Sequence, residues 1–273
     1  MRPPFALSLA LAGLSTVFAQ PGDSWCPPVA LVFARATGDP PQGVEGASEA
    51  EFVAAADQFW SKGYGAVGHS ILTNLTALIP SEGGRAAASG NPVQYPANGS
   101  GCPSENVGVD DLVSYISAMA SVCPKTKFAV GGHGEGGVVA VKAIQAREDI
   151  LANVIAVTIL GGPACPEAVA DRCRSYCNAG DTFCEQSHPV DDCQSEERRW
   201  VSEGLLTERA DIENPLATLV APDCGGSEPP EKGHVVGNGI DPHTGYHEDG
   251  FYVRAAACFI FNRWQASLQS FSR

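Results

Sequence analysis

A cluster of glycines directly after a short apolar run is the most chemically informative feature of this 273-residue sequence. The run covers residues 127–130, the glycines lie within 131–137, and residues 138–147 have helical spacing. A strand, a tight turn and a helix in this order form the setting in which the motif G-x-S-x-G exposes a nucleophilic serine. Here the flanking residues are Gly132 and Gly136, but the central residue is Gly134.

A glycine-rich turn before a helix can instead bind phosphate through backbone N–H groups and the helix N-terminus. The sequence lacks the lysine of the G-x-x-x-x-G-K motif and does not fit G-x-G-x-x-G in the usual position. The motif alone leaves both interpretations open.

His243 and His247 are four residues apart, but the residues between them do not look helical and no C-x-x-C pair accompanies them. We therefore expect neither a metal nor another cofactor.

Strand-like and helix-like segments alternate along the chain. Such alternation predicts an α/β fold whose central, mainly parallel sheet is covered by helices on both faces. Asp110 and Asp111 are good residues for a helix N-terminus. The predicted strands are 29–33, 92–95, 127–130 and 154–160, and the predicted helices are 50–60, 68–79, 138–147 and 252–271.

Residues 1–19 are expected to be a signal peptide, because a short basic start precedes an uncharged apolar run and a small-x-small site before Gln20. No later segment is long and apolar enough to span a membrane. We expect residues 20–273 to form one secreted, extracellular domain and a monomer. The net charge of −14 disfavours nucleic acid and anionic membranes as partners.

Ten cysteines behind a signal peptide predict up to five disulfides. The triplets at Asn74 and Asn98 are candidate acceptors of N-linked glycans. Residues 185–240 form a polar stretch in which only 201–210 suggests a helix. Long loops are usually functional or held in place, and a disulfide between Cys193 and Cys224 is the candidate for holding this one.

Several short segments of the chain form a recognisable series. They are F-A-R-A-T-G-D-P at 33–40, V-Q-Y-P-A at 93–97, C-P-K-T-K at 123–127, G-H-G-E-G at 132–136, Y-C-N-A-G-D-T-F-C at 176–184 and H-T-G-Y at 243–246. In this order they resemble the cutinase family, which includes acetylxylan esterases. The resemblance covers about residues 29–184 and 241–265.

The resemblance implies a role for each matched position. Asp181 would be the triad acid and His243 the general base, in the chain order of α/β-hydrolases. His188 and His247 are the alternative histidines for that position. Thr37 and the backbone N–H of Glu135 would form the oxyanion hole. Cys177 and Cys184 would form a disulfide that closes the loop around the acid.

The sequence departs from the family at the elbow, where Gly134 removes the serine and His133 and Glu135 replace the usual Tyr and Gln. Gly161-Gly162-Pro163 replaces the usual G-D-P, and the insertion is unusually long.

Whether the protein is an enzyme therefore stays open. The leading hypothesis is a pseudoenzyme that binds a polymeric ester, a cell-wall polysaccharide or a secreted or surface protein, at the former site or through the insertion. The alternative is a weak or rerouted carboxylic-ester hydrolase, like a cutinase or an acetylxylan esterase, that uses His243, Asp181 and water.

Overall fold

The computed structural model describes residues 25–37, 63–83, 86–185 and 221–269. The predictions for the signal peptide, for the helices at 50–60 and 201–210, and for His188 and Cys193 lie outside these ranges.

A six-stranded sheet forms the centre of the molecule, with the strand order β2-β1-β3-β4-β5-β6 and parallel pairing throughout. Its strands are β1 (Val29–Ala34), β2 (Ser89–Pro92), β3 (Lys127–His133), β4 (Val154–Leu160), β5 (Cys173–Asn178) and β6 (Lys232–His234). Strand β4 is wholly buried and apolar except for Thr158, as expected of a strand covered on both faces.

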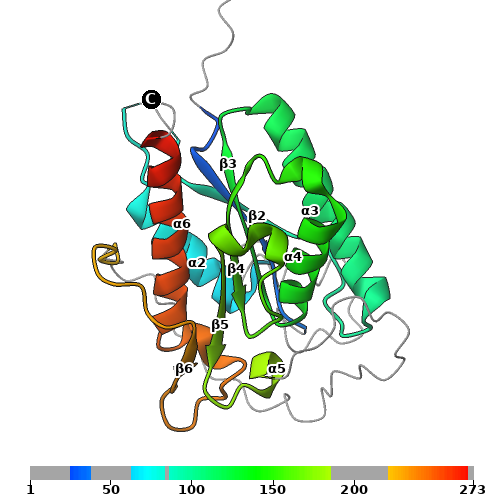
Figure 1. Ribbon diagram of the computed structural model, residues 1–273, viewed down its shortest axis with the longest axis vertical. Coiled ribbons are helices and arrows are strands. Elements are labelled where there is room, and N and C mark those ends of the chain that lie inside the picture. Colours follow the sequence, from blue (N-terminus) through cyan, green and yellow to red (C-terminus); the bar gives the residue numbers. More distant parts are fainter. Residues whose placement is uncertain (1–24, 38–62, 84–85, 186–220, 270–273) are drawn as a thin grey trace, which may run out of the picture.

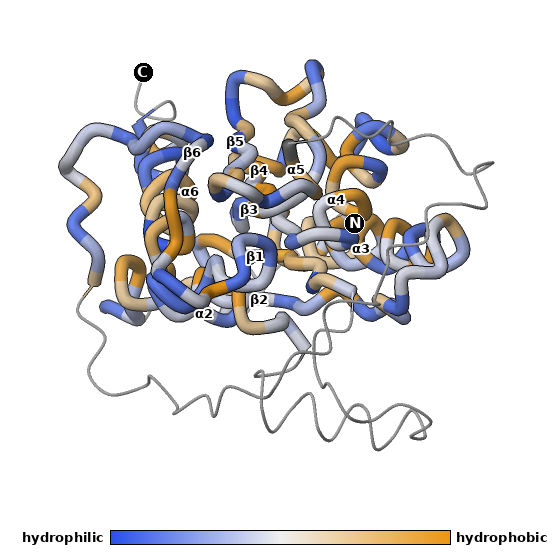
Figure 2. The backbone as a smooth tube through the Cα atoms, turned by 90° about the horizontal axis from the view of Figure 1, so that it is seen from below, coloured by the Kyte–Doolittle hydropathy of each residue, from blue (hydrophilic) through white to orange (hydrophobic). Residues whose placement is uncertain are grey.

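Helices cover both faces of the sheet, which confirms the predicted α/β fold class. On one face lie α2 (Gly65–Leu78) and α6 (Phe251–Gln269), and on the other lie α3 (Cys102–Val122) and α4 (Glu135–Ala146) (Figure 1). Viewed along the other axis, the sheet lies between these two helical layers (Figure 2). Short turns complete the described chain: α5 (Thr182–Glu185) and the 3-10 helices at Glu148–Ile150, Glu167–Arg172 and Gly245–His247.

Alternate side chains of β1 show how one strand serves both layers. Leu31 and Phe33 pack with the residues of α2 and α6, whereas Ala30 and Val32 pack with those of α3 and α4. This alternation follows from the two-residue period of a strand. No helix within the described ranges is long and apolar enough to cross a membrane.

Two predicted boundaries are wrong. Helix α3 begins at Cys102 rather than near Asp110, because Gly101 has a φ of 69° and Pro103 suits the first helical turn. Asp111 instead accepts a hydrogen bond from the backbone N–H of Gln94 (2.8 Å).

The strand expected at 92–95 is displaced toward the N-terminus and pairs with β1 over Ser89–Pro92. Proline carries no N–H and suits the edge of a sheet. Beyond Val93, whose N–H donates to Phe33, the chain leaves the sheet.

The C-terminal part of the insertion is joined to the sheet. Its strand β6 pairs with β5, and its Cys224 forms a disulfide with Cys258 of α6. The suggested Cys193–Cys224 bridge is therefore wrong, because Cys224 already has another partner.

Candidate functional site

The turn between β3 and α4 has the backbone conformation of an elbow. Gly134 has φ 54° and ψ −120°, a region that costs residues with a Cβ of order 1–3 kcal/mol. A Cβ on Gly132 would overlap the backbone of Gly136, and a Cβ on Gly136 would overlap the carbonyl group of Ala34. Only glycine fits either flanking position, so this turn requires the spacing G-x-x-x-G.

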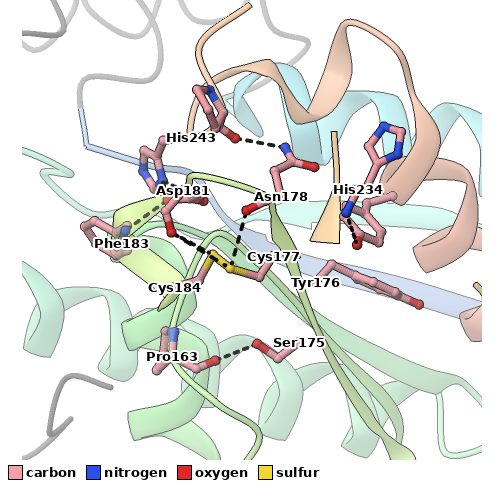
Figure 3. The surroundings of a disulfide bond; sticks show 12 residues. Pro163, Ser175, Tyr176, Cys177, Asn178, Asp181, Phe183, Cys184, His234 and His243 are labelled. Carbon is pink, nitrogen blue, oxygen red and sulfur yellow. Dashed lines mark hydrogen bonds and ion pairs between the residues drawn. A yellow bond between two sulfur atoms is a disulfide. The ribbon is translucent and has the colours of Figure 1, made fainter. Parts of the chain in front are cut away.

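The loop after β5 brings a carboxyl group to the same edge of the sheet. Asp181 is buried and lies between Cys177 and Cys184, which form a disulfide (Figure 3). This is the bridge that the resemblance implies. Asp181 accepts hydrogen bonds from the Phe183 N–H (3.0 Å) and the Tyr246 hydroxyl (2.7 Å).

His243 lies against this carboxyl group, with Nδ1 at 3.0 Å from Asp181 Oδ1 and 3.2 Å from Oδ2. Burial acts to raise the pKa of Asp181, but the hydrogen bonds from His243, Tyr246 and Phe183 outweigh it and hold the pKa below its usual range. Because an ionised carboxylate only accepts hydrogen bonds, Nδ1 carries the proton. In the neutral ring, Nε2 then has a free lone pair.

The Nε2 atom of His243 faces the elbow. A Cβ built on Gly134 would lie 3.1 Å from it and 3.4 Å from the Cβ of Ala36. Because 3.1 Å is tight for a Cβ, the His243 ring would shift by a few tenths of an ångström to admit a serine, whose hydroxyl oxygen would then lie beside Nε2. The site therefore brings together an acid, an oriented imidazole and an elbow, without a nucleophilic side chain on the elbow.

Thr37 lies at the other side of the elbow, where its hydroxyl donates to Glu135 Oε2 at 2.6 Å. The same carboxyl oxygen accepts from the backbone N–H of Gly99 at 3.1 Å. Thr37 thus contacts the side chain of Glu135, and its hydroxyl proton is directed at that carboxyl group.

Three further residues fix the loop that carries His243. His133 is buried, and its Nε2 donates to the His243 carbonyl oxygen at 2.8 Å. Asn178 Nδ2 donates to the Pro242 carbonyl at 2.8 Å, and Tyr246 joins the loop to Asp181. Burial, and then the neighbouring Asp181, raise the pKa of the Tyr246 hydroxyl, which keeps it a donor. All three residues lie in segments that resemble the family, but the sequence did not predict these contacts.

The other candidate histidine in the described residues makes a different contact. His247 Nδ1 is 3.2 Å from the carbonyl oxygen of Thr244, whereas His243 lies beside Asp181.

The two candidate glycan acceptors differ in exposure. Asn74 is buried within α2, and its amide donates to the Ser70 carbonyl. Asn98 is exposed one residue before Gly99, so it is the more accessible candidate.

The sequence profile of the cutinase family matches residues 46–194, more than half of the chain. Together with the sheet order and the helices on both faces, this match places the chain in the cutinase family.

Among curated proteins, the chain is similar to the phospholipase Culp4 of Mycobacterium tuberculosis, with 29% identity over 134 residues, covering 49% of this chain and 47% of that protein. It is also similar to a probable carboxylesterase, Culp3, of the same species, with 31% identity over 146 residues, covering 54% of this chain and 42% of that protein. The chain thus spans about half the length of these relatives.

Among solved structures, an iodinated complex of acetyl xylan esterase matches with a TM-score of 0.47 and 15% identity. The match covers 88% of this chain and 99% of that one.

Proposed function

We propose that this protein is a secreted member of the cutinase family that binds a ligand at the site around His243 without ordinary serine-esterase activity. The observation that carries the proposal is the glycine at the elbow: the position from which a serine would attack faces His243 Nε2 but holds Gly134. The disulfides support export, because such bonds persist in oxidising compartments.

Without the serine oxygen no acyl-enzyme can form. Serine hydrolases that lose a triad member keep roughly 10³–10⁴-fold acceleration over water, which comes from binding and the oxyanion hole. Because the acid and the histidine of the family site are retained, the site should still suit an ester, or the hydroxyl groups of a polymer that carries esters. The ligands proposed are therefore a polymeric ester, a cell-wall polysaccharide, or a secreted or surface protein that carries such groups.

The test compares the wild-type chain with Gly134→Ser, using a fluorophosphonate probe and p-nitrophenyl butyrate. We expect no labelling of the wild type and measurable labelling of Gly134→Ser, since the new oxygen would lie beside Nε2. Labelling of the serine variant should disappear when His243→Ala is added. Covalent labelling or robust turnover by the wild type would contradict the proposal.

A second candidate function is weak ester hydrolysis by water, which the intact Asp181–His243 pair favours. His243 Nε2 would act as general base toward a water molecule, with no covalent intermediate. This function predicts slow wild-type turnover that His243→Ala abolishes, while the fluorophosphonate still fails to label. If His243→Ala leaves the turnover unchanged, the activity does not come from this site.

A further inference from the structure

The hydrogen bond between Thr37 and Glu135 has a consequence for the ligands that the site accepts. A hydroxyl group has a single proton to donate. The Thr37 proton goes to Glu135 Oε2 at 2.6 Å, so it is not directed at a ligand. Hydrogen bonds to a carboxylate are roughly twice as strong as those between neutral groups, which makes this arrangement hard for a ligand to displace.

Several contacts hold the carboxyl group in place. Glu135 is 1% exposed and is the first residue of α4, where the helix dipole favours a negative group. Its Oε2 also accepts the Gly99 N–H. Its Oε1 is buried and forms no hydrogen bond with any described residue. The carboxyl group is thus fixed beside the elbow, and one of its oxygens has no donor among the described residues.

We propose that Glu135 is a specificity-determining residue: it engages Thr37, the expected oxyanion-hole donor, and excludes anionic ligands from the site. The inference deepens the proposed function and rests on it. A carboxylate in contact with Thr37 repels an oxygen that carries negative charge, whether in a transition state or in a bound carboxylate or phosphonate. The ligand class that fits is therefore uncharged: an intact ester or a sugar hydroxyl.

This inference means that Gly134→Ser alone restores only part of the chemistry. Loss of one oxyanion-hole donor costs on the order of 10²–10³ in kcat. Glu135→Gln removes the charge, and its amide nitrogen can donate to Thr37 Oγ1 and free the hydroxyl proton. Glu135→Met removes the acceptor altogether.

The experiment measures fluorophosphonate labelling rates in folded proteins. We expect Gly134→Ser/Glu135→Gln, or the corresponding Glu135→Met double variant, to label at least tenfold faster than Gly134→Ser. Adding Thr37→Val should lower the labelling rate of both proteins, by a factor at least ten times larger in the double variant than in Gly134→Ser. Glu148→Gln, an exposed glutamate outside the site, is the matched control. Equal labelling rates for all the serine variants would overturn the inference.

A binding measurement without the serine separates this inference from the proposed function. By calorimetry, Glu135→Gln in the otherwise wild-type chain should bind butylphosphonate at least tenfold more tightly than the wild type, with binding of neutral N-butylacetamide changed less than threefold. An unchanged phosphonate affinity would overturn the role of Glu135, even if Gly134→Ser labels as expected. Wild-type labelling would instead overturn the proposed function and leave the phosphonate comparison valid.

Discussion

At the elbow, single atoms decide which residues are allowed. Gly136 lies so close to β1 that a Cβ on it would overlap the carbonyl group of Ala34. Gly134 differs from its neighbours, because a Cβ there would meet mainly the side chain of His243. The elbow can therefore lose or gain its serine without losing the turn.

Gly136→Ala is expected to lower the free energy of unfolding by about 3 kcal/mol or more, since backbone atoms on both sides would have to move. Urea unfolding followed by circular dichroism measures the effect. Gly226→Ala is the matched control, because nothing lies within 4 Å of a Cβ there; it should stay within about 0.5 kcal/mol of the wild type. Equal unfolding midpoints for the two variants would contradict the close approach of α4 to β1.

Asp181→Asn tests the electrostatics of the acid. The pKa of Asp181 is lowered in the fold, so its ionised form stabilises the protein above the unfolded-state pKa of about 3.9. That stabilisation is lost as the pH falls through the lowered pKa. The difference in unfolding free energy between wild type and Asp181→Asn should therefore shrink between pH 5.5 and 2.5. The exposed Asp110→Asn variant is the control, and a difference that grows toward low pH would contradict the prediction.

The sequence predicted site residues that lie within recognisable motifs, but it did not predict the contacts between them. Motif spacing singled out Gly134, and the resemblance to the family implied Asp181 and His243. The hydrogen bond from Thr37 to Glu135 joins residues 98 positions apart, and no local pattern encodes it. His133 stood out only as a departure from the family, because its contact with the His243 carbonyl depends on the fold.

Among the elements, α3 and α4 are joined by a buried ion pair. Lys142 Nζ lies 2.6 Å from Glu105 Oε2, and their side chains are 11% and 2% exposed. Because α4 begins at the elbow, this pair helps to fix the helix that carries Glu135.

Lys142→Met should lower the free energy of unfolding by about 3–5 kcal/mol, because it leaves the buried Glu105 without its cation. Adding Glu105→Leu should recover most of the loss, since the pair is then replaced by apolar groups. Chemical denaturation of the two single variants and the double variant gives the coupling. Arg147→Met, at an exposed ion pair, should have a much smaller effect, and additive losses at Lys142 and Glu105 would refute the coupling.

Element types were easier to predict than element ends. The apolar run of β4 was predicted with its observed bounds, because a strand buried on both faces is apolar along nearly its whole length. The start of α3 was missed, because Gly101 and Pro103 determine it rather than the more conspicuous acidic pair. Strand β6 is only Lys-Gly-His, and its pairing with β5 is visible only in three dimensions.

For the whole molecule, the disulfides differ in how much chain they enclose. Cys26–Cys123 joins residues 97 positions apart, whereas Cys165–Cys173 spans 8. The alternation of strands and helices was sufficient to predict the layered fold. The pairing of these cysteines was not predictable, because it depends on which strands and helices become neighbours.

Replacing both cysteines of Cys26–Cys123 by alanine should destabilise the protein more than replacing Cys165 and Cys173. The chain-entropy relation gives about 4.7 kcal/mol for the long loop and about 2.5 kcal/mol for the short one. Urea unfolding of the two double variants checks the order. The reverse order would show that native contacts, rather than restriction of the unfolded chain, dominate these bonds.

The exposed Asn98 stands one residue from Gly99, whose N–H binds Glu135. A branched sugar on Asn98, where the host adds one, would begin one residue from this contact and limit the size of the molecules that approach the site there. Small esters would still reach the site, whereas the sugar would hinder the approach of a polymer chain. The same polypeptide made in a glycosylating host and in a bacterium would then differ in the largest molecule that can reach His243, with no change in its sequence.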